Sequence, residues 1–239
     1  MRLQGLLLAA GLVLLAGCGF LDSEESPDDY DVHGIDISTW QGDIDWNAVR
    51  ADGVAFAFIK ATEGGDHLDP RFQQNWEAAR AAGVPRGAYH FYYFCRPVAD
   101  QIAWFIENVP VDPSALPPVL DMEWNAHSPS CNRRPPRAEV LADMNAFLAA
   151  IEAHYGRRPI IYTSVDFHRD VLVDAFTDYP VWVRSVADPP YRRYTRRQWT
   201  FWQYTAEGRV RGISGDVDRN VYWGSAREWT RFVRGETPR

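Results

Sequence analysis

The chain has 239 residues, with 25 lysines and arginines against 32 aspartates and glutamates and a formal net charge of −7. This acidic balance, without an extended basic stripe, argues against nucleic-acid binding. A hydrophobic fraction of 46% is ordinary for a globular protein, and the roughly 205 residues after the N-terminal segments suit one large α/β domain.

The chain begins MRLQGLLLAAGLVLLAGC, which has the anatomy of an export signal. Its apolar run is too short for an ordinary membrane span and ends in small residues. Because LAGC resembles a bacterial lipobox, we expect residues 1–17 to be a lipoprotein signal peptide and Cys18 to carry lipid. The alternative is an ordinary cleaved signal with an incidental cysteine. Gly19 replaces the aspartate that favours inner-membrane retention, so an outer-membrane anchor is expected in a Gram-negative cell.

Residues 18–31 are predicted to be the lipidated cysteine and an acidic tether, because GFLDSEESPDDYD contains little to bury. Residues 32–239 are expected to form the folded domain. The basic cluster YRRYTRRQ at 191–198 is interpreted as a solvated loop. Membrane contact is expected through the lipid anchor only, and the protein is expected to be a monomer.

From residue 32 onward, short β-rich runs alternate with segments whose apolar residues recur at helical spacing. Eight strands mostly separated by helices favour a parallel sheet closed into a barrel, with an open doubly wound sheet as the alternative. The helical pattern weakens after about residue 165, which indicates an irregular barrel. The eight predicted strand runs are 32–38, 54–62, 86–94, 117–125, 158–164, 180–186, 199–205 and 215–223.

Polar residues cluster toward the C-terminal ends of these runs. In a barrel of parallel strands those ends open onto one mouth, where active sites of this architecture lie. The sequence therefore predicts a site built from several strands. Its members are Asp36, Ser38, Lys60, Glu63, His90, Tyr92, Asp121, Glu123, Tyr162, Gln203 and Tyr204.

Asp121 and Glu123 lie two residues apart in the apolar run VLDMEWN. Alternation along a strand puts both on one face with Cα atoms about 6–7 Å apart. Two carboxyl groups this close raise each other's pKa, and unequal burial makes one an acid and the other an anion, as in glycosidic bond cleavage. A metal site and a structural pair are the alternatives, but the six histidines are scattered singly and no zinc-like spacing occurs.

Aromatic residues near strand ends can stack on sugar rings, although core packing is the more common role for any one of them. Lys60 is the only lysine in the chain, and beside Glu63 it can either hold a carboxylate ionised or form a structural ion pair. The candidate substrate contacts are Tyr92, Trp124, Tyr162, Trp182, Gln203, Lys60 and Glu63.

Cys95 and Cys131 remain as a pair after Cys18 is lipidated, and in an oxidising compartment a pair is a disulfide candidate. Each follows a predicted strand, the third and the fourth, so both are expected at the barrel mouth. Two buried free thiols are the alternative. A bridge would close a loop of about 36 residues and stabilise the fold by about 3–4 kcal/mol.

Four motifs in order, GIDISTWQGDIDW, VAFAFIKATEGGDHLDPRF, GAYHFY and PPVLDMEW, resemble those of glycoside hydrolase family 25. The resemblance runs from about His33 to Trp223 and implies that residues 32–239 are the catalytic domain. It implies an α/β fold, an irregular TIM-like barrel of eight strands with about five helices. One departure is His67, where the family usually has an aromatic residue or leucine, and this puts a substrate contact in doubt but not the chemistry.

The resemblance implies a lysozyme, an N-acetylmuramidase that hydrolyses β-1,4 bonds in the glycan strands of peptidoglycan. It maps the general acid to Glu123, its partner to Asp121 and a first-strand carboxylate to Asp36. A late aspartate maps to Asp218, with Asp216 as the less favoured choice. No metal or organic cofactor is implied, and Asp121 is expected to stay anionic.

Two routes with net retention remain open, a direct nucleophile and assistance by the substrate's own N-acetyl group. Two other functions also remain open. One is a peptidoglycan-binding lipoprotein without turnover, which the intact Glu123, Asp121 and Asp36 disfavour. The other is hydrolysis of a different polysaccharide, which needs only a reshaped groove.

Overall fold

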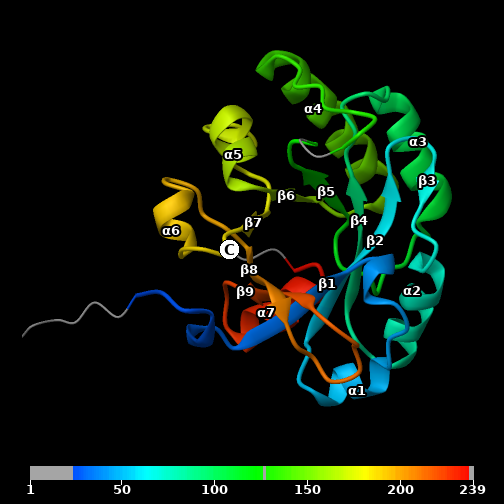
Figure 1. The fold of residues 1–239 in the computed structure, drawn as a ribbon, viewed down its shortest axis with the longest axis vertical. Helices are drawn as coiled ribbons and strands as arrows, with labels where there is room; N and C mark the ends of the chain where they lie inside the picture. Colours follow the sequence, from blue (N-terminus) through cyan, green and yellow to red (C-terminus); the bar gives the residue numbers. More distant parts are fainter. Residues whose placement is uncertain (1–23, 126–127, 237–239) are drawn as a thin grey trace, which may run out of the picture.

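The computed structural model describes residues 24–125 and 128–236, which form a closed barrel of eight strands (Figure 1). Each of the eight predicted runs overlaps one barrel strand, although the second and seventh runs end before the corresponding strands do. Pairing of the first strand with both the second and the last closes the sheet. The barrel strands are β1 (Val32–Ile37), β2 (Phe56–Glu63), β4 (Arg86–Phe91), β5 (Val119–Met122), β6 (Ile160–Thr163), β7 (Val181–Arg184), β8 (Phe201–Gly208) and β9 (Val217–Tyr222).

The last strand departs from the expected all-parallel arrangement. β9 runs antiparallel to both β8 and β1, whereas the other neighbouring barrel strands are parallel. Residues 209–216 join β8 to β9, and a parallel return needs a crossover of a dozen residues or more. The short connection therefore forces a hairpin. A two-residue strand, β3 (His67–Leu68), adds a second small hairpin on β2.

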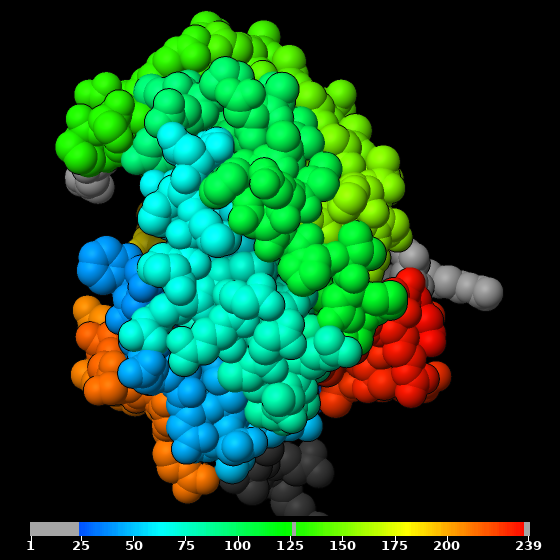
Figure 2. All heavy atoms as spheres, turned by 90° about the vertical axis from the view of Figure 1, so that its right-hand side faces the viewer, coloured from blue at the N-terminus to red at the C-terminus, as the bar shows by residue number. Residues whose placement is uncertain are grey.

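Helices cover the barrel unevenly. The longer ones lie on the side of β2, β4 and β5, and Figure 2 shows the face covered by the segments that hold α2 and α3. After β6 the connections hold only short helical pieces, as the fading sequence pattern predicts. In the described residues, the α-helical segments are α1 (Trp46–Ala51), α2 (Phe72–Ala81), α3 (Val98–Asn108), α4 (Arg137–Tyr155), α5 (Val165–Phe167), α6 (Pro190–Arg193) and α7 (Ala226–Val233).

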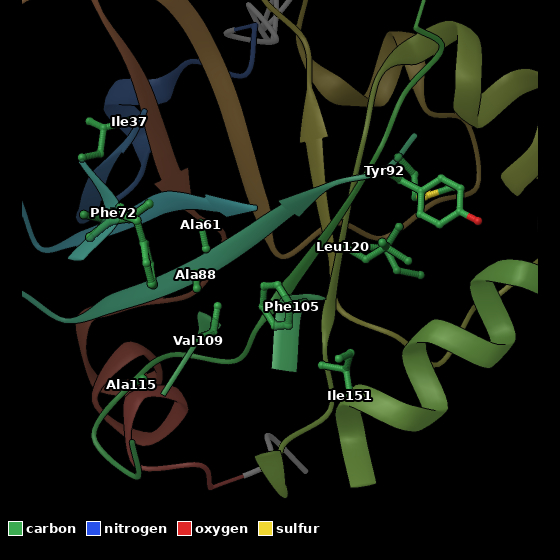
Figure 3. Packing of buried hydrophobic residues seen from close by; sticks show 14 of the residues in the cluster. Ile37, Ala61, Phe72, Ala88, Tyr92, Phe105, Val109, Ala115, Leu120 and Ile151 are labelled. Carbon is green, nitrogen blue, oxygen red and sulfur yellow. The ribbon is translucent and has the colours of Figure 1, made fainter. Parts of the chain in front are cut away.

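The larger apolar core lies between the strands and the covering helices. Leu120 of β5, Phe105 of α3 and Ile151 of α4 meet there, fully buried (Figure 3). A disulfide ties the same side of the barrel at its mouth, joining Cys95 after β4 to Cys131 after β5 with Cα atoms 5.7 Å apart.

A second apolar cluster fills the lower part of the barrel interior. Phe56, Phe201 and Tyr222 contact Trp229 of α7, with ring centroids 5.1 to 6.3 Å apart. Helix α7 therefore closes the end of the barrel opposite the mouth. This closed floor leaves the C-terminal ends of the parallel strands as the open end.

The N-terminal segment differs from the solvated tether expected up to residue 31. The Tyr30 ring packs edge-on against Trp199 and Trp202, and the Glu24 carboxylate lies 2.5 Å from the Arg192 guanidinium. Residues 24–31 therefore lie against the β7–β8 side, where no long helix covers the barrel. Arg192, part of the loop interpreted as solvated, is their ionic partner. Within the described residues, no helix has the length and apolar character needed to cross a membrane.

Candidate active site

A cavity of about 260 Å³ opens at the C-terminal ends of the strands. Strand alternation explains its composition, because every second residue of each strand points into the barrel. Aromatic rings occupy the lower interior positions and polar groups the upper ones. The lining residues are Asp36, Ser38, Trp40, Lys60, Tyr89, Phe91, Asp121, Glu123, Tyr162, Trp182, Arg184, Gln203 and Asp218.

Asp36 and Asp218 are opposite each other in the antiparallel β1–β9 pair. One oxygen of Asp36, Oδ2, accepts hydrogen bonds from the side-chain amides of Gln203 (2.9 Å) and Asn220 (2.8 Å). Burial and then the charge of Asp218 raise the pKa of Asp36 well above its usual range, and the two amide donors only partly oppose this. Burial also raises the pKa of Asp218.

Asp121 and Glu123 point into the same cavity from the end of β5. Burial and then the charge of Glu123 raise the pKa of Asp121 well above its usual range, and its Oδ1 is buried without a hydrogen-bond partner among the described residues. Burial likewise raises the pKa of Glu123, whereas Arg184 opposes the rise. Burial and the charge of Glu123 therefore oppose the anionic form expected for Asp121, and the cluster of carboxyl groups binds protons at higher pH than isolated carboxyl groups do.

Two cations line the cavity, and they differ in their partners. The Lys60 ammonium lies 2.5 Å from Glu63 and 5.0 Å from the centre of the Phe91 ring. The Arg184 guanidinium has no carboxylate within 4.0 Å in the described part of the chain, although its charge lowers the pKa of Glu123, Asp36 and Asp218. Arg184 is therefore the cation most available to an incoming anionic group.

Aromatic side chains form the cavity floor and its rim. Tyr162 donates its hydroxyl hydrogen to Gln203 Oε1 (3.0 Å), and Trp182 donates its indole hydrogen to Asn220 Oδ1 (2.7 Å). Both rings are thereby fixed beside the carboxyl groups. Trp40 is different, because 88% of its surface is exposed at the rim. Its turn is held by a hydrogen bond from the Thr39 amide to the carboxylate of Asp69 (2.8 Å).

Two of the predicted substrate contacts point away from the cavity, for one geometric reason. Because Phe91 and Glu123 face the interior, the residue after each of them faces outward. The Tyr92 hydroxyl donates to Asp143 of α4 (3.0 Å), within the outer core of Figure 3. The Trp124 indole donates to Asp170 (3.0 Å).

Glu63 and Asp216 lie outside the cavity lining. Glu63 contacts the site only through its ion pair with Lys60 and does not line the cavity. Of the two late aspartates, Asp218 lines the cavity, whereas Asp216 pairs with Arg209 at 2.9 Å. Asp218 is therefore the late carboxyl group of the site.

Sequence reasoning missed Arg184 and Asn220, although each had a signal. Arg184 lies two residues after Trp182, and Asn220 two residues after Asp218, so strand alternation places them on the interior face. The described residues contain no group of three or more His, Cys, Asp or Glu side chains arranged to hold a metal ion.

The chain is similar to proteins of known family over most of its length. The model of Glycosyl hydrolases family 25 matches residues 35–213. Lysozyme M1 of Streptomyces globisporus is 40% identical over 209 residues, which cover 82% of this chain and 69% of that protein.

Two solved structures agree with the family match. A family 25 glycosyl hydrolase from Bacillus anthracis has a TM-score of 0.80 at 36% identity, covering 86% of this chain and 95% of that one. A bacterial lysozyme from Streptomyces coelicolor has a TM-score of 0.78 at 36% identity, covering 86% and 98% of the two chains. With its barrel, its carboxyl-lined mouth and these similarities, the chain belongs to glycosyl hydrolase family 25.

Proposed function

We propose that this protein is a lysozyme that hydrolyses the β-1,4 bonds between N-acetylmuramic acid and N-acetylglucosamine in peptidoglycan, with net retention. The observation that carries the proposal is the convergence of Asp36, Asp121, Glu123 and Asp218 in one cavity. The similarity to Lysozyme M1 and to the Streptomyces coelicolor lysozyme supports the substrate class.

Glu123 is assigned as the general acid. Its burial raises its pKa, so it retains a proton at higher pH than an ordinary glutamic acid and can protonate the departing sugar oxygen. Its longer side chain and its position after the last residue of β5 also bring it nearer the open mouth than Asp121.

Asp121 is assigned to stabilise the positive charge that develops at the anomeric carbon. Its side chain lines the cavity, and its buried Oδ1 has no protein partner among the described residues, so no hydrogen bond holds that oxygen away from a bound substrate. The developing charge favours the ionised form of Asp121, which offsets the burial that raises its pKa in the unliganded protein. Both a covalent route and assistance by the N-acetyl group use Asp121 in this position.

The substrate contacts proposed around this centre are Tyr162, Trp182, Gln203, Lys60 and Trp40. Trp40 offers an exposed ring face beside the carboxyl groups, as stacking on a sugar requires. Lys60 and Gln203 supply hydrogen-bond donors to hydroxyl or acetamido oxygens.

The test is digestion of purified peptidoglycan, followed by identification of the sugar at each new reducing end. The proposal expects N-acetylmuramic acid there, and expects the Glu123→Gln protein to release these ends far more slowly than the parent. New ends carrying N-acetylglucosamine would contradict it. Binding without cleavage would favour the wall-binding lipoprotein, and cleavage of another glycan alone would favour a different polysaccharide as substrate.

We further infer that the protein is exported and held in the cell envelope by lipid on Cys18, in the outer membrane of a Gram-negative cell. Cys18 and the signal segment lie outside the described residues. The leader sequence supports the inference, and so does the disulfide, because disulfides persist in oxidising compartments. The Cys18→Ser protein is expected to move from the detergent phase to the aqueous phase. Unchanged partitioning would contradict the anchor, and sedimentation of the Cys18→Ser protein would test the expected monomer.

A further inference from the structure

A second cavity, of about 410 Å³, lies outside the barrel between the β6–β7 and β7–β8 connections, the regions marked by α5 and α6 in Figure 1. None of the residues that line it lines the catalytic cavity. Its polar lining consists of His168, Asp174, Thr177, Thr195, Arg196 and Arg197.

The backbone around this cavity is unusual. The non-glycine residues with positive φ in the described parts of the chain are Asp174 (58°), Phe176 (49°) and Arg196 (65°). Asp174 and Arg196 line the cavity, and Phe176 directly precedes the lining residue Thr177. A π-helix, His168–Leu172, forms the start of one wall. Such backbone costs free energy and clusters at functional sites. The walls are therefore held in costly conformations on both sides of the same space.

His168 is a buried polar side chain that faces this space. It is 5% exposed, and its ring nitrogens have no hydrogen-bond partner among the described residues. The ring is held edge-on against Tyr194 at 5.1 Å. Tyr194 is itself fixed by hydrogen bonds from its hydroxyl to the carbonyl oxygens of Thr163 (3.1 Å) and Arg184 (2.7 Å). Solvent in the cavity reaches the ring nitrogens of His168, because neither is among the buried partnerless atoms of the described residues, and a ligand can therefore replace that water.

The other polar groups of the lining are mostly donors. The Arg196 guanidinium and the hydroxyls of Thr177 and Thr195 make no side-chain hydrogen bond or ion pair within the described residues. Arg197 donates to the carbonyl oxygens of Ala175 (2.9 Å) and Phe176 (2.8 Å). These bonds join the two walls, and because both acceptors are uncharged, the positive charge of Arg197 is not neutralised by them.

The charge of the lining favours an anion. Two arginines face one acid, Asp174, in a protein whose overall charge is negative. Burial and then the charge of Arg197 lower the pKa of His168 to about 4, so at neutral pH its ring offers one N–H donor and one acceptor. Guanidinium, hydroxyl and imidazole donors around one space match the oxygens of phosphate or carboxylate.

We propose that this cavity is a binding site for a small oxyanion, a phosphate or carboxylate group, held by Arg196, His168 and the two threonine hydroxyls. The site is separate from the catalytic mouth and shares no lining residue with it. It does not depend on the proposed lysozyme activity.

Titration of the intact protein with inorganic phosphate and, separately, with acetate tests the proposal. The readouts are calorimetric heat and the NMR signal of the His168 ring. Saturable binding is expected, with the His168 signal displaced and its pKa moved upward by the bound negative charge. Arg196→Asn removes the guanidinium while suiting the left-handed backbone, and is expected to weaken binding about tenfold or more.

The matched control is Arg227→Gln, which removes an exposed arginine on α7, outside the cavity. His168→Phe keeps the ring against Tyr194 and is also expected to weaken binding. Saturable binding of phosphate, acetate or both, lost in Arg196→Asn and kept in Arg227→Gln, would support the site and identify which oxyanion it binds. Absence of saturable binding of either anion, or equal binding by Arg196→Asn and the parent protein, would overturn it.

Discussion

Four carboxyl groups share the catalytic cavity with two cations, and one of these cations, Lys60, is already paired with Glu63. Negative charge therefore exceeds the positive charge available to balance it. Burial adds to this excess, so the pKa values of all four carboxyl groups are raised. These raised pKa values affect proton donation by the site, the stability of the fold and the pH range of activity.

Replacing Glu123 with glutamine removes the proposed acid while keeping the shape of the side chain. The turnover number is expected to fall by about two to four orders of magnitude, because general acid catalysis contributes a factor of this size. Release of reducing ends from peptidoglycan measures it. Glu107→Gln, an exposed change on α3, is the control. A Glu123→Gln rate within about tenfold of the parent rate would show that another group donates the proton.

Replacing Asp121 with asparagine is expected to abolish most activity yet stabilise the fold at pH 7. The folded-state pKa of Asp121 lies above its unfolded value of about 3.9, so the folded state binds more protons between the two values. Stability is therefore lost as pH rises through this interval, and asparagine removes that loss.

Thermal unfolding at several pH values tests this stabilisation. The Tm of Asp121→Asn should exceed that of the parent at pH 7, by about 2–4 °C for each kcal/mol, and the gap should close toward pH 4. Asp31→Asn, an exposed change, is the control. A gap that widened as the pH fell would contradict the assignment of a raised pKa.

Arg184 is expected to set the pH range of activity. Its charge lowers the pKa of Glu123, Asp36 and Asp218. Arg184→Gln should therefore move both limbs of the pH profile of kcat/KM to higher pH, while Arg184→Lys keeps them near the parent positions. Limbs that stay in place in Arg184→Gln, measured beside the lysine variant, would mean that other groups control the profile.

At the scale of elements, the barrel is closed at one end by helix α7 and open at the other. The Trp229 side chain, 8% exposed, packs against Phe56, Phe201 and Tyr222 beneath the catalytic cavity. Capping by Ser225 fixes the start of this short helix, because its hydroxyl and the Glu228 carboxylate bond each other's backbone amides. The rigidity of the site floor therefore depends on a helix at the far end of the chain.

Trp229→Ala is expected to destabilise the protein by about 3–5 kcal/mol, because it leaves a cavity among aromatic rings. Urea unfolding with the disulfide intact measures the change. Trp223→Ala removes a tryptophan that is 49% exposed, and should cost less than about 1 kcal/mol. Similar losses in the two variants would show that α7 does not hold the floor.

At the scale of the whole molecule, residues 24–31 take the place of a missing helix on the β7–β8 side. If Cys18 carries lipid, only residues 18–23 separate the anchor from the seated segment. Their fully extended reach is at most about 20 Å. With such an anchor, the docked segment would restrict how far the catalytic mouth can move from the membrane.

Tyr30→Ala is expected to release this segment, because Tyr30 is the ring that packs on Trp199 and Trp202. Limited proteolysis should cut within residues 24–31 faster, and tryptophan fluorescence should shift toward that of solvated rings. Tyr191→Ala, which removes an exposed ring on α6, is the control. Equal cleavage rates in the two variants would contradict docking through Tyr30.

The local pattern of apolar and polar residues determined the secondary structure and the faces on which side chains lie. The eight strand runs, the fading of helices after residue 165 and the pairing of Asp121 with Glu123 on one face all follow from periodicity, because side chains alternate along a strand. The same rule separates Trp182 and Arg184, which face the cavity, from Tyr92 and Trp124, which do not. Strict application of this alternation to the sequence places Tyr92 and Trp124 outside the cavity.

Contacts between distant segments decided the strand register, the docking of the N-terminal segment and the pKa values of the site. The position of Asp36 opposite Asp218 depends on an antiparallel last strand, and the seating of Tyr30 depends on rings about 170 residues away. The elevated pKa values arise from burial and from charges that only the closed barrel brings together. Sequence periodicity fixes which face a side chain takes, whereas register, closure and burial are properties of the assembled chain, and they decided the chemistry of the site.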